Sequence, residues 1–430
     1  MNILLALAGL SLIILVHEIG HYLAARAFGI RVLEFSIFMG PRLWKKTVKG
    51  TDYSLRLIPF GGFVKMMGEE ESSEDTGAFC KKPLWQRVTV TAAGALFNVI
   101  FALILFTLSF AVTGTYTPTI DKAAPGSPAQ VAGIQPGDRL LSYNDRNFYA
   151  YLDFDILTYG AGDPAVKAVV RRGSEKLEFI FTPMRYRYLM GVQISSRTGE
   201  DFNLITAVPS ADSPAAKAGI QAGDRILEIN GMPVDEYADI AAGLAVTGED
   251  PANLVISREG EKREVSLTPV KERLMEYTAS GLELVYMKTW NPLSNLAASA
   301  RMCVSMVRAT YLQIAWLITG KASMAEVRGP VGIVDMIGEV VTEVSGMGWG
   351  YILISFVQLM AMISINIGIM QFLPLPALDG GRLLIQGVEG VRRKAITPEK
   401  EAMISYAGFM LFILLFLVVT FNDIRRWIGG

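Results

Sequence analysis

Histidine and cysteine are scarce in this 430-residue chain, which contains two of each. Charge is sparse as well, since charged residues make up 19% of the chain against 51% hydrophobic residues. So much apolar sequence excludes a disordered protein, and the balance of 40 basic against 41 acidic residues excludes a basic nucleic-acid-binding protein. The composition indicates a chain that lies partly in lipid and partly in water, with no nucleic-acid partner.

Three long intervals of the chain contain no Asp, Glu, Lys or Arg. They lie between Arg87 and Asp121, between Glu343 and Asp379, and between Glu401 and Asp423. Each exceeds the roughly 20 residues that an α-helix needs to cross a hydrocarbon core. A fourth uncharged stretch begins the chain, and no basic residue precedes it. This favours a retained first membrane span over a cleaved signal peptide.

The basic residues orient these spans. The segment from Arg26 to Arg87 carries eleven Lys and Arg side chains, which by the positive-inside rule places it in the cytoplasm. Residues 121–343 then lie on the external side, and Asp379 marks the return to the cytoplasmic side. Cys80 and Cys303 fall on opposite sides, so no disulfide is expected.

The middle of the chain contains a duplication. The sequence SPAQVAGIQPGDRLL from Ser127 recurs as SPAAKAGIQAGDRIL from Ser213, an offset of 86 residues. Each copy predicts a short helix that stops at a glycine, then a Gly-Asp turn and a strand. The motif resembles the PDZ domain of bacterial envelope proteases, and PDZ domains bind extended peptides or chain termini by adding a strand to a sheet. A steric filter and a β-rich spacer without a ligand are the alternatives.

An apolar stretch from Met302 to Leu317 follows the duplication, and its uncharged core is too short to span a bilayer. We expect a helix here that either lies on the outer membrane surface or packs against the bundle.

Both histidines belong to the sequence His17-Glu18-Ile19-Gly20-His21. Histidines at positions i and i+4 lie on one face of a helix, so both imidazoles can reach one metal ion. The H-E-x-x-H pattern is typical of zinc hydrolases, in which the glutamate takes a proton from water and passes it to the leaving amine. The alternative, two hydrogen-bonded helix histidines, leaves the use of both histidines at this spacing unexplained.

A catalytic zinc site needs a further ligand besides two imidazoles. Asp379 ends the third uncharged interval, in the sequence P-L-P-A-L-D-G-G. The first and third spans run in the same direction, so Asp379 and the histidines reach the same side of the membrane. The prolines and glycines around Asp379 break the helix and let its carboxylate turn inward. Taken alone, Asp379 would be a turn residue at the membrane boundary.

The H-E-x-x-H of the first span, the PDZ-like copies and the L-D-G-G after P-x-P together resemble the site-2 protease family of intramembrane zinc metalloproteases. The resemblance covers essentially the whole chain. It implies regulated intramembrane proteolysis in the bacterial inner membrane, with cleavage inside transmembrane segments of single-pass proteins. Typical substrates of the family are anti-sigma factors after a first cut and remnant signal peptides. The resemblance also implies periplasmic PDZ domains and an active site near the cytoplasmic side.

Family roles transfer to single residues of this chain. The resemblance implies that His17, His21 and Asp379 bind one Zn²⁺ per chain and that Glu18 is the catalytic base. The segment from Tyr53 to Met67 resembles the family's membrane re-entrant β-segment, and an ordinary cytoplasmic hairpin is the alternative. Its expected substrate-binding residues are Gly61, Gly62, Phe63, Val64 and Lys65.

Three more positions match or depart from family motifs. Gly94 and Asn98 resemble the family's G-x-x-x-N, for which we expect a role in close helix packing. Gln371 stands where the family usually has asparagine. We expect its amide to hold substrate backbone or to stabilise the oxyanion, and not to bind zinc.

The sequence therefore predicts a multi-pass α-helical membrane protein with four transmembrane helices, a re-entrant β-segment and two inserted PDZ-like α+β domains. The predicted divisions are the first span with H-E-x-x-H (1–28), a cytoplasmic loop with the re-entrant segment (29–87), the second span (88–114), PDZ-like domains (115–200 and 201–286), a periplasmic membrane-surface helical region (287–343), the third span (344–378), a cytoplasmic loop with L-D-G-G (379–401), the fourth span (402–422) and a tail (423–430).

Two rival functions fit parts of the pattern. The first is a membrane H-E-x-x-H protease whose catalytic domain lies outside the bilayer and whose third ligand is a glutamate. The second is a non-catalytic PDZ scaffold or membrane chaperone, which would purify without zinc.

Overall fold

The structure, a computed structural model, describes residues 2–69, 71–158, 165–195, 201–321, 348–376 and 378–394, with isolated positions between 332 and 346 and between 396 and 420. The chain divides into two compact units. Met1–Thr117 and Tyr286–Gly430 form the first, here called the membrane unit, and Pro118–Val285 forms the second, here called the insert.

Three helices in the described part of the membrane unit are long and apolar enough to cross a bilayer. They are α1 (Asn2–Ala27), α2 (Leu84–Thr113) and α10 (Trp349–Gln371). Helix α10 ends at Gln371 and not at 378, since Pro374 and Pro376 cannot continue a helix. The predicted fourth span, 402–422, lies largely outside the described residues.

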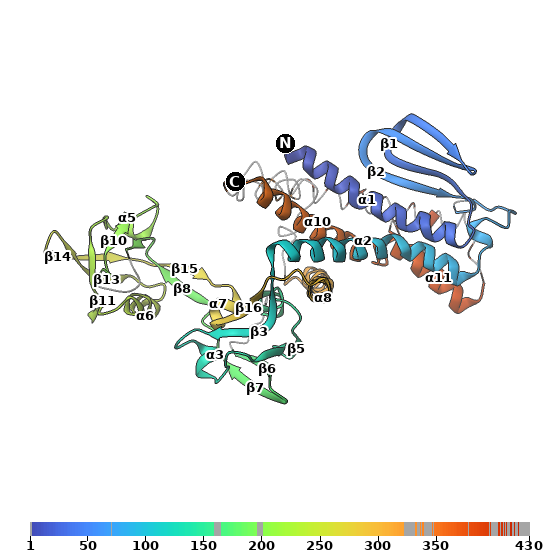
Figure 1. The fold of residues 1–430 in the computed structure, drawn as a ribbon. Coiled ribbons are helices and arrows are strands. Elements are labelled where there is room, and N and C mark those ends of the chain that lie inside the picture. Colours follow the sequence, from blue (N-terminus) through green and yellow to red (C-terminus); the bar gives the residue numbers. More distant parts are fainter. Residues whose placement is uncertain are drawn as a thin grey trace. The chain divides into compact units, whose positions relative to one another are not determined.

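Helix α2 packs against α1 on one side and α10 on another (Figure 1). A Cβ added to Gly20 of α1 would lie 2.5 Å from the carbonyl oxygen of Ala93, and one added to Gly368 of α10 would lie 2.9 Å from that of Ala95. The helix backbones therefore touch directly, as small residues permit in membranes. Helix α8 (Pro292–Ile318) also packs on α2 and α10. Of the two arrangements expected for this region, a helix on the membrane surface or a helix packed against the bundle, these contacts correspond to the second.

A sheet of two long strands, β1 (Val32–Val48) and β2 (Thr51–Met66), lies beside α1 (Figure 1). Both strands fold back on themselves, so that Phe35 pairs with both Tyr53 and Val64. The result is a set of antiparallel segments in the order 61–66, 32–37, 52–55 and 44–48. The sheet therefore extends well beyond the 53–67 segment that the sequence indicated.

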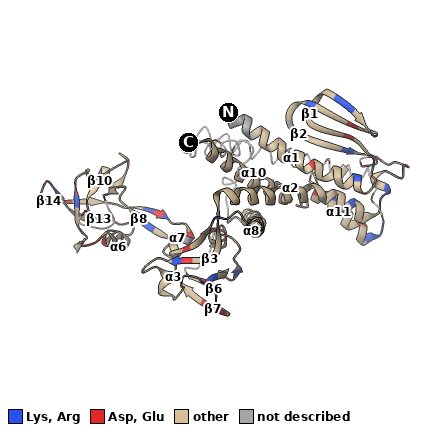
Figure 2. Ribbon diagram, viewed as in Figure 1, with Lys and Arg blue, Asp and Glu red and all other residues tan. Residues whose placement is uncertain are grey.

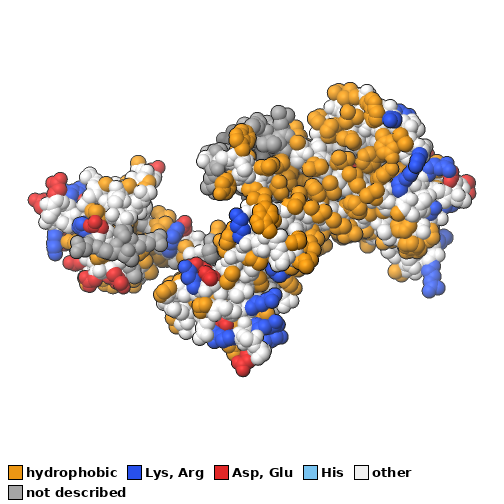
Figure 3. Space-filling model, in the orientation of Figure 1, with side chains coloured by type: hydrophobic (Ala, Val, Ile, Leu, Met, Phe, Trp, Pro, Cys, Tyr) orange, Lys and Arg blue, Asp and Glu red, His pale blue; other side chains and the backbone are white. Residues whose placement is uncertain are grey.

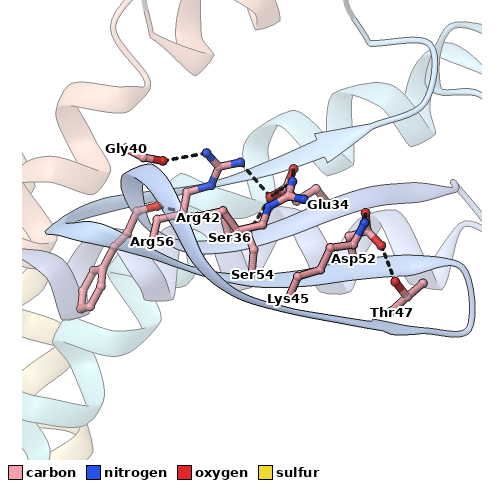
Figure 4. A network of polar contacts seen from close by, with 10 residues as sticks. Glu34, Ser36, Gly40, Arg42, Lys45, Thr47, Asp52, Ser54 and Arg56 are labelled. Carbon is pink, nitrogen blue, oxygen red and sulfur yellow. Dashed lines mark hydrogen bonds and ion pairs between the residues drawn. The ribbon is translucent and has the colours of Figure 1, made fainter.

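A polar network joins these folded-back segments (Figure 4). The carboxylate of Glu34 accepts hydrogen bonds from Ser54 Oγ at 2.6 Å, Arg56 Nη2 at 2.9 Å and Arg42 Nη2 at 3.1 Å. Arg56 also donates to the carbonyl oxygen of Gly40 at 2.8 Å. Because three segments meet at one carboxylate, the network helps to fix the register of the sheet.

Helix α11 (Asp379–Arg392) follows the proline-containing turn after α10, in a segment that the sequence treats as a loop. Many Lys and Arg residues of the membrane unit lie on α11 and the β1–β2 sheet (Figure 2). Hydrophobic side chains cover much of the visible surface of this unit (Figure 3). An apolar surface of this kind is what a chain seated in a bilayer requires.

The insert contains two repeats with separate hydrophobic cores. The first comprises β3 (Thr115–Ala123), α3 (Pro128–Val131), β4 (Arg139–Tyr143), β5 (Arg146–Asn147), α4 (Asp153–Thr158), β6 (Val166–Arg172) and β7 (Glu175–Phe181). The second comprises β9 (Gln193–Ile194), β10 (Ile205–Ala207), α5 (Pro214–Lys217), β11 (Arg225–Ile229), β12 (Met232–Pro233), α6 (Tyr237–Thr247), β13 (Ala252–Arg258) and β14 (Glu261–Leu267). Strand β8 (Tyr186–Leu189) lies between the two repeats in the chain. It pairs with β15 (Val270–Arg273), which follows the second repeat and precedes α7 (Glu276–Ser280).

The second repeat is nested inside the first. Strand β16 (Leu282–Met287) follows the second repeat in the chain but pairs with β3, in the sheet order β16-β3-β4-β6-β7. A Cβ added to Gly281 would lie 2.2 Å from Ser127 Cβ, just as one added to Gly191 would lie 2.5 Å from Ser213 Cβ. Strand β16, which follows Gly281, therefore occupies the same position in the first repeat as β9, which follows Gly191, occupies in the second. The sequence divisions 115–200 and 201–286, drawn one after the other, do not describe this nesting.

An ion pair recurs in both repeats with the same geometry. Asp138 accepts from Arg172 at 2.7 and 2.8 Å, and Asp224 accepts from Arg258 at 2.7 and 2.8 Å. Each arginine also donates to a backbone carbonyl, that of Gly133 or of Gly219. Burial raises the pKa of both carboxyls, but the arginine hydrogen bonds, a backbone N–H and the arginine charge together outweigh it and hold each pKa below its usual value.

Candidate active site

Helix α1 carries both histidines on one face, near its C-terminal end. His17 and His21 are 7% and 9% exposed, and their Nε2 atoms lie 3.1 Å apart. The Nδ1 atom of His21 lies 2.8 Å from the carbonyl oxygen of Val90 on α2. In the tautomer that carries its proton on Nδ1, His21 donates to this carbonyl, and the lone pair of its Nε2 atom is free for a metal.

Asp379 is the first residue of α11 and reaches both imidazoles. Its Oδ2 atom lies 3.2 Å from His17 Nε2 and 3.2 Å from His21 Nε2. A Cβ on Gly380 would lie 2.1 Å from the carbonyl oxygen of Leu373, and one on Gly381 would lie 2.4 Å from that of Leu375. The two glycines therefore let α11 begin directly against the proline-containing turn.

These three side chains pass a geometric test for a metal site. His17, His21 and Asp379 form a group of convergent ligand atoms among the described residues, with mutual separations of 3.1 to 3.2 Å. Ligands about 2.0–2.1 Å from a tetrahedral zinc ion lie roughly 3.3 Å apart. Two imidazole nitrogens and a carboxylate oxygen are also the donor types that zinc takes. The residues present fit a zinc ion.

Glu18 lies next to the β2 segment that begins with Gly61. Its Cγ atom is 3.7 Å from where a Cβ on Gly62 would lie. Gly61 has a φ of +77°, which favours glycine and turns the chain into the 61–66 segment. This segment pairs with residues 32–37 on one side, and no described strand pairs with its other side. A carboxylate and a free strand edge therefore flank the ligand group together.

The other expected substrate-binding residues lie on this segment or beside Asp379. Phe63 packs under the guanidinium of Arg56, 5.0 Å from the ring centroid, and Val64 and Lys65 pair with Phe35 and Glu34. Gln371 ends α10, and its Oε1 accepts from the backbone N–H of Asp379 at 3.3 Å. Its amide oxygen therefore helps to hold the first residue of α11 in place.

Gly94 on α2 lies closer to the site than the packing role predicted for it, whereas Asn98 packs against Gly368 of α10, 3.2 Å from where a Cβ on that glycine would lie. A Cβ on Gly94 would lie 2.3 Å from His21 Nε2 and 2.7 Å from His17 Cε1. Asn98, one turn further on, is fully buried, and its amide atoms have no hydrogen-bond partner among the described residues. The G-x-x-x-N spacing identified both positions, but only the structure shows that Gly94 faces the imidazoles.

Two imidazoles and a carboxylate that converge among membrane-length helices, with a glutamate adjacent, define a metal-dependent hydrolase. Comparison with known families identifies which one. The model of peptidase family M50 matches residues 5–415. The chain belongs to this family, the site-2 protease family of zinc metalloproteases.

Individual relatives cover almost the full chain. The regulator of sigma-E protease RseP of Salmonella typhimurium is 28% identical over 99% of this chain and 98% of its own. Protease RseP of Yersinia pestis is 28% identical over 99% of this chain and 100% of its own. Among solved structures, the HtrA3 PDZ domain bound to the phage-derived ligand FGRWV matches 20% of this chain and 89% of its own, at 21% identity and a TM-score of 0.18.

Proposed function

We propose that this protein is an intramembrane zinc endopeptidase that cuts peptide bonds inside the transmembrane segments of single-pass proteins. The observation that carries the proposal is the convergence of His17, His21 and Asp379 within 3.2 Å of one another, with both histidines on α1, a helix of membrane-spanning length. An ionisable group of this kind is costly in a membrane helix unless it has a function.

Four residues have roles in the proposed reaction. His17, His21 and Asp379 hold one zinc ion per chain, which supplies a Lewis acid when bound. The carboxylate of Glu18 takes a proton from the attacking water and delivers it to the nitrogen of the leaving amine. Asp379 and the imidazoles are largely buried, so the site also excludes bulk water from the reacting bond.

A transmembrane helix hides its peptide bonds, so the substrate has to be extended before it can be cut. We propose that the free edge of residues 61–66 holds the substrate as an added strand next to Glu18. Backbone groups of an unpaired edge supply the hydrogen bonds that the unwound helix loses. Gln371 acts from the other side by steadying Asp379, and does not bind zinc.

The proposed placement has four spans, with the β1–β2 sheet re-entering the membrane. Ser11 Oγ on α1 donates to the carbonyl oxygen of Pro59 on β2 at 2.9 Å. Ser11 precedes His21 by ten residues, about 15 Å along a helix, so the sheet reaches far along α1. The eleven basic residues between Arg26 and Arg87 support a cytoplasmic location for this end and a periplasmic location for the insert.

The proposed substrates are based on the family, and the proposed role of the insert is based on its repeats. We propose an inner-membrane location, and substrates that include anti-sigma factors after a first cut and remnant signal peptides; the relatives named as regulators of sigma-E support this choice. The repeats act as PDZ-like domains that either contact a peptide or chain terminus or exclude large substrates.

The test replaces Glu18 by Gln in the full-length chain and measures zinc content together with cleavage of a panel of single-pass segments. We expect zinc to be retained and cleavage to fall at least about 100-fold. Glu71→Gln, an exposed glutamate of the same unit, is the matched control. Undiminished cleavage by Glu18→Gln would refute the base, and insensitivity of the wild type to a chelator would refute metal catalysis.

A further measurement separates this proposal from its rivals. Asp379→Asn should lose zinc, whereas a protease with a glutamate as third ligand would keep it. A scaffold or chaperone would contain no zinc even as wild type.

A further inference from the structure

Helix α11 presents a row of polar side chains along one face. Asp379, Arg382, Gln386 and Glu389 are spaced three or four residues apart, so they lie on the same side of the helix. Gln386 is 1% exposed and Glu389 is 4% exposed. Long polar side chains are rarely buried so fully unless they are paired.

Helix α2 presents a matching row. Arg87, Thr91, Gly94 and Asn98 also recur every three or four residues. Arg87 Nη2 donates to Glu389 Oε2 at 2.6 Å, and the Arg87 side chain is 13% exposed.

The pairing continues along both helices. Gln386 Nε2 donates to Thr91 Oγ1 at 3.0 Å in a buried contact. Two turns from Gln386 along α11, Asp379 reaches the imidazoles that lie against Gly94, which is one turn from Thr91 along α2. Because residue numbers rise along α2 as they fall along α11, the two helices are antiparallel here.

The second carboxylate oxygen of Glu389 also accepts a hydrogen bond. Its Oε1 accepts from the backbone N–H of Ile396 at 2.6 Å, so one carboxylate ties α2, α11 and the chain beyond α11. Removing one partner of such a buried pair leaves the other charge uncompensated, which makes the contact sensitive to register. An apolar interface would tolerate sliding or rotation of α11 to a greater extent.

Helix α11 needs such a restraint, because α10 ends at Gln371 and a turn with Pro374 and Pro376 separates the two helices. The position of the carboxylate of Asp379 is therefore set by what α11 touches and not by the continuation of α10. A metal ligand displaced by even 1 Å is a poor ligand.

We propose that Arg87, Thr91, Gln386 and Glu389 form a register lock between α2 and α11 that positions Asp379 for the metal. They are positioning residues and act only through Asp379, from which Gln386 and Glu389 are separated by about two and three helical turns of α11. The inference rests on the proposed zinc site and adds residues to it that bind neither zinc nor substrate.

The test measures zinc affinity by competition with a chromophoric chelator, together with thermal unfolding of the zinc-free full-length protein and cleavage. The variants are Arg87→Glu, Glu389→Arg, the double exchange, and Thr91→Val, which keeps the volume but removes the oxygen that Gln386 contacts. Arg31→Glu is the control, because it reverses an exposed arginine that pairs with Asp75 in the same unit at 2.8 Å.

We expect each charge reversal to weaken zinc binding about 10- to 100-fold, Thr91→Val about 3- to 10-fold, and the double exchange to restore most of the loss. The control should bind zinc as the wild type does. Should Arg87→Glu or Glu389→Arg fail to accumulate, Thr91→Val decides alone.

Zinc affinities within about twofold of the control, at any level of cleavage, would overturn the lock. Reduced thermal stability with unchanged zinc affinity would do the same, because it would make the row a purely structural contact. Failure of the proposed function looks different: the wild type itself would then bind no zinc, or Glu18→Gln would still cleave.

Discussion

The membrane unit and the insert use buried polar side chains differently. In the membrane unit, His17, His21 and Asp379 form a group with no second copy among the described residues. In the insert, the Asp138–Arg172 pair is repeated as Asp224–Arg258 with nearly the same distances. A substitution at or beside this ligand group should therefore change the chemistry, whereas one at the ion pairs of the insert should change local stability and leave the chemistry intact.

The largest effect is expected from Gly94→Ala, which adds a single methyl group. That carbon would lie 2.3 Å from His21 Nε2, so the imidazoles have to move out of position. A shift of about 1 Å in a reacting group costs roughly 100-fold in rate, and we expect kcat/KM to fall by at least that factor. Zinc content and cleavage of a single-pass segment are the measurements.

Gly387→Ala is the control for this change, since nothing lies within 4 Å of where its Cβ would be. It should cleave and bind zinc normally. Normal zinc content and activity in Gly94→Ala would mean that the site is less constrained than its contacts indicate, and the contrast between the units would lose its main support.

An intermediate effect is expected from Asp138→Asn and Asp224→Asn. Each removes the charge of a carboxylate that is 1% exposed, and hydrogen bonds to charged groups contribute about 1.5–3 kcal/mol. Hydrogen exchange of the full-length protein should show faster opening in the altered repeat alone. Equal loosening of both repeats after one substitution would show that the nested repeats unfold as one body.

The same ion pairs predict how the insert responds to acid. Because the pKa of Asp138 and of Asp224 is lower in the folded state, the pairs stabilise fully above the unfolded value of about 3.9 and lose this contribution as pH falls further. Pepsin digestion with mapped cut sites should show both repeats becoming susceptible below about pH 4. Susceptibility that begins near pH 6 would point to other groups.

The smallest effect is expected from Ser127→Ala and Ser213→Ala. Each serine caps a four-residue helix and accepts from a backbone N–H, at 3.3 Å in the first repeat and 3.1 Å in the second. Loss of such a cap costs about 0.5–2 kcal/mol, and short helices lie at the low end. Hydrogen exchange at α3 and α5 should rise slightly, and a change in cleavage rate would contradict the separation of the two units.

Much of the membrane unit could be predicted because its signals are local or follow from topology. The gaps in charge locate α1, α2 and α10, and the i, i+4 spacing puts His17 and His21 on one face. The direction of the spans then selects Asp379.

Contacts between segments far apart in the chain could not be predicted, because no local sequence pattern indicates them. Arg87 and Glu389 are 302 residues apart, and nothing in either local sequence indicates that they pair. The partners of Asp138 and Asp224 were also missed, although Arg172 and Arg258 keep the 86-residue offset. The nesting of the repeats was hidden because the duplicated motif marks the middle of each copy and not its last strand.

Nesting also fixes an order of events during synthesis. The ribosome makes β3 to β7 of the first repeat early, but the strand that completes their sheet, β16, ends only at Met287. All strands of the second repeat sheet, β11 to β14, lie between residues 225 and 267 and therefore leave the ribosome before β16 does. The repeat that comes later in the chain is therefore the first that can finish folding, and the earlier one stays open until the chain returns toward the membrane at α8.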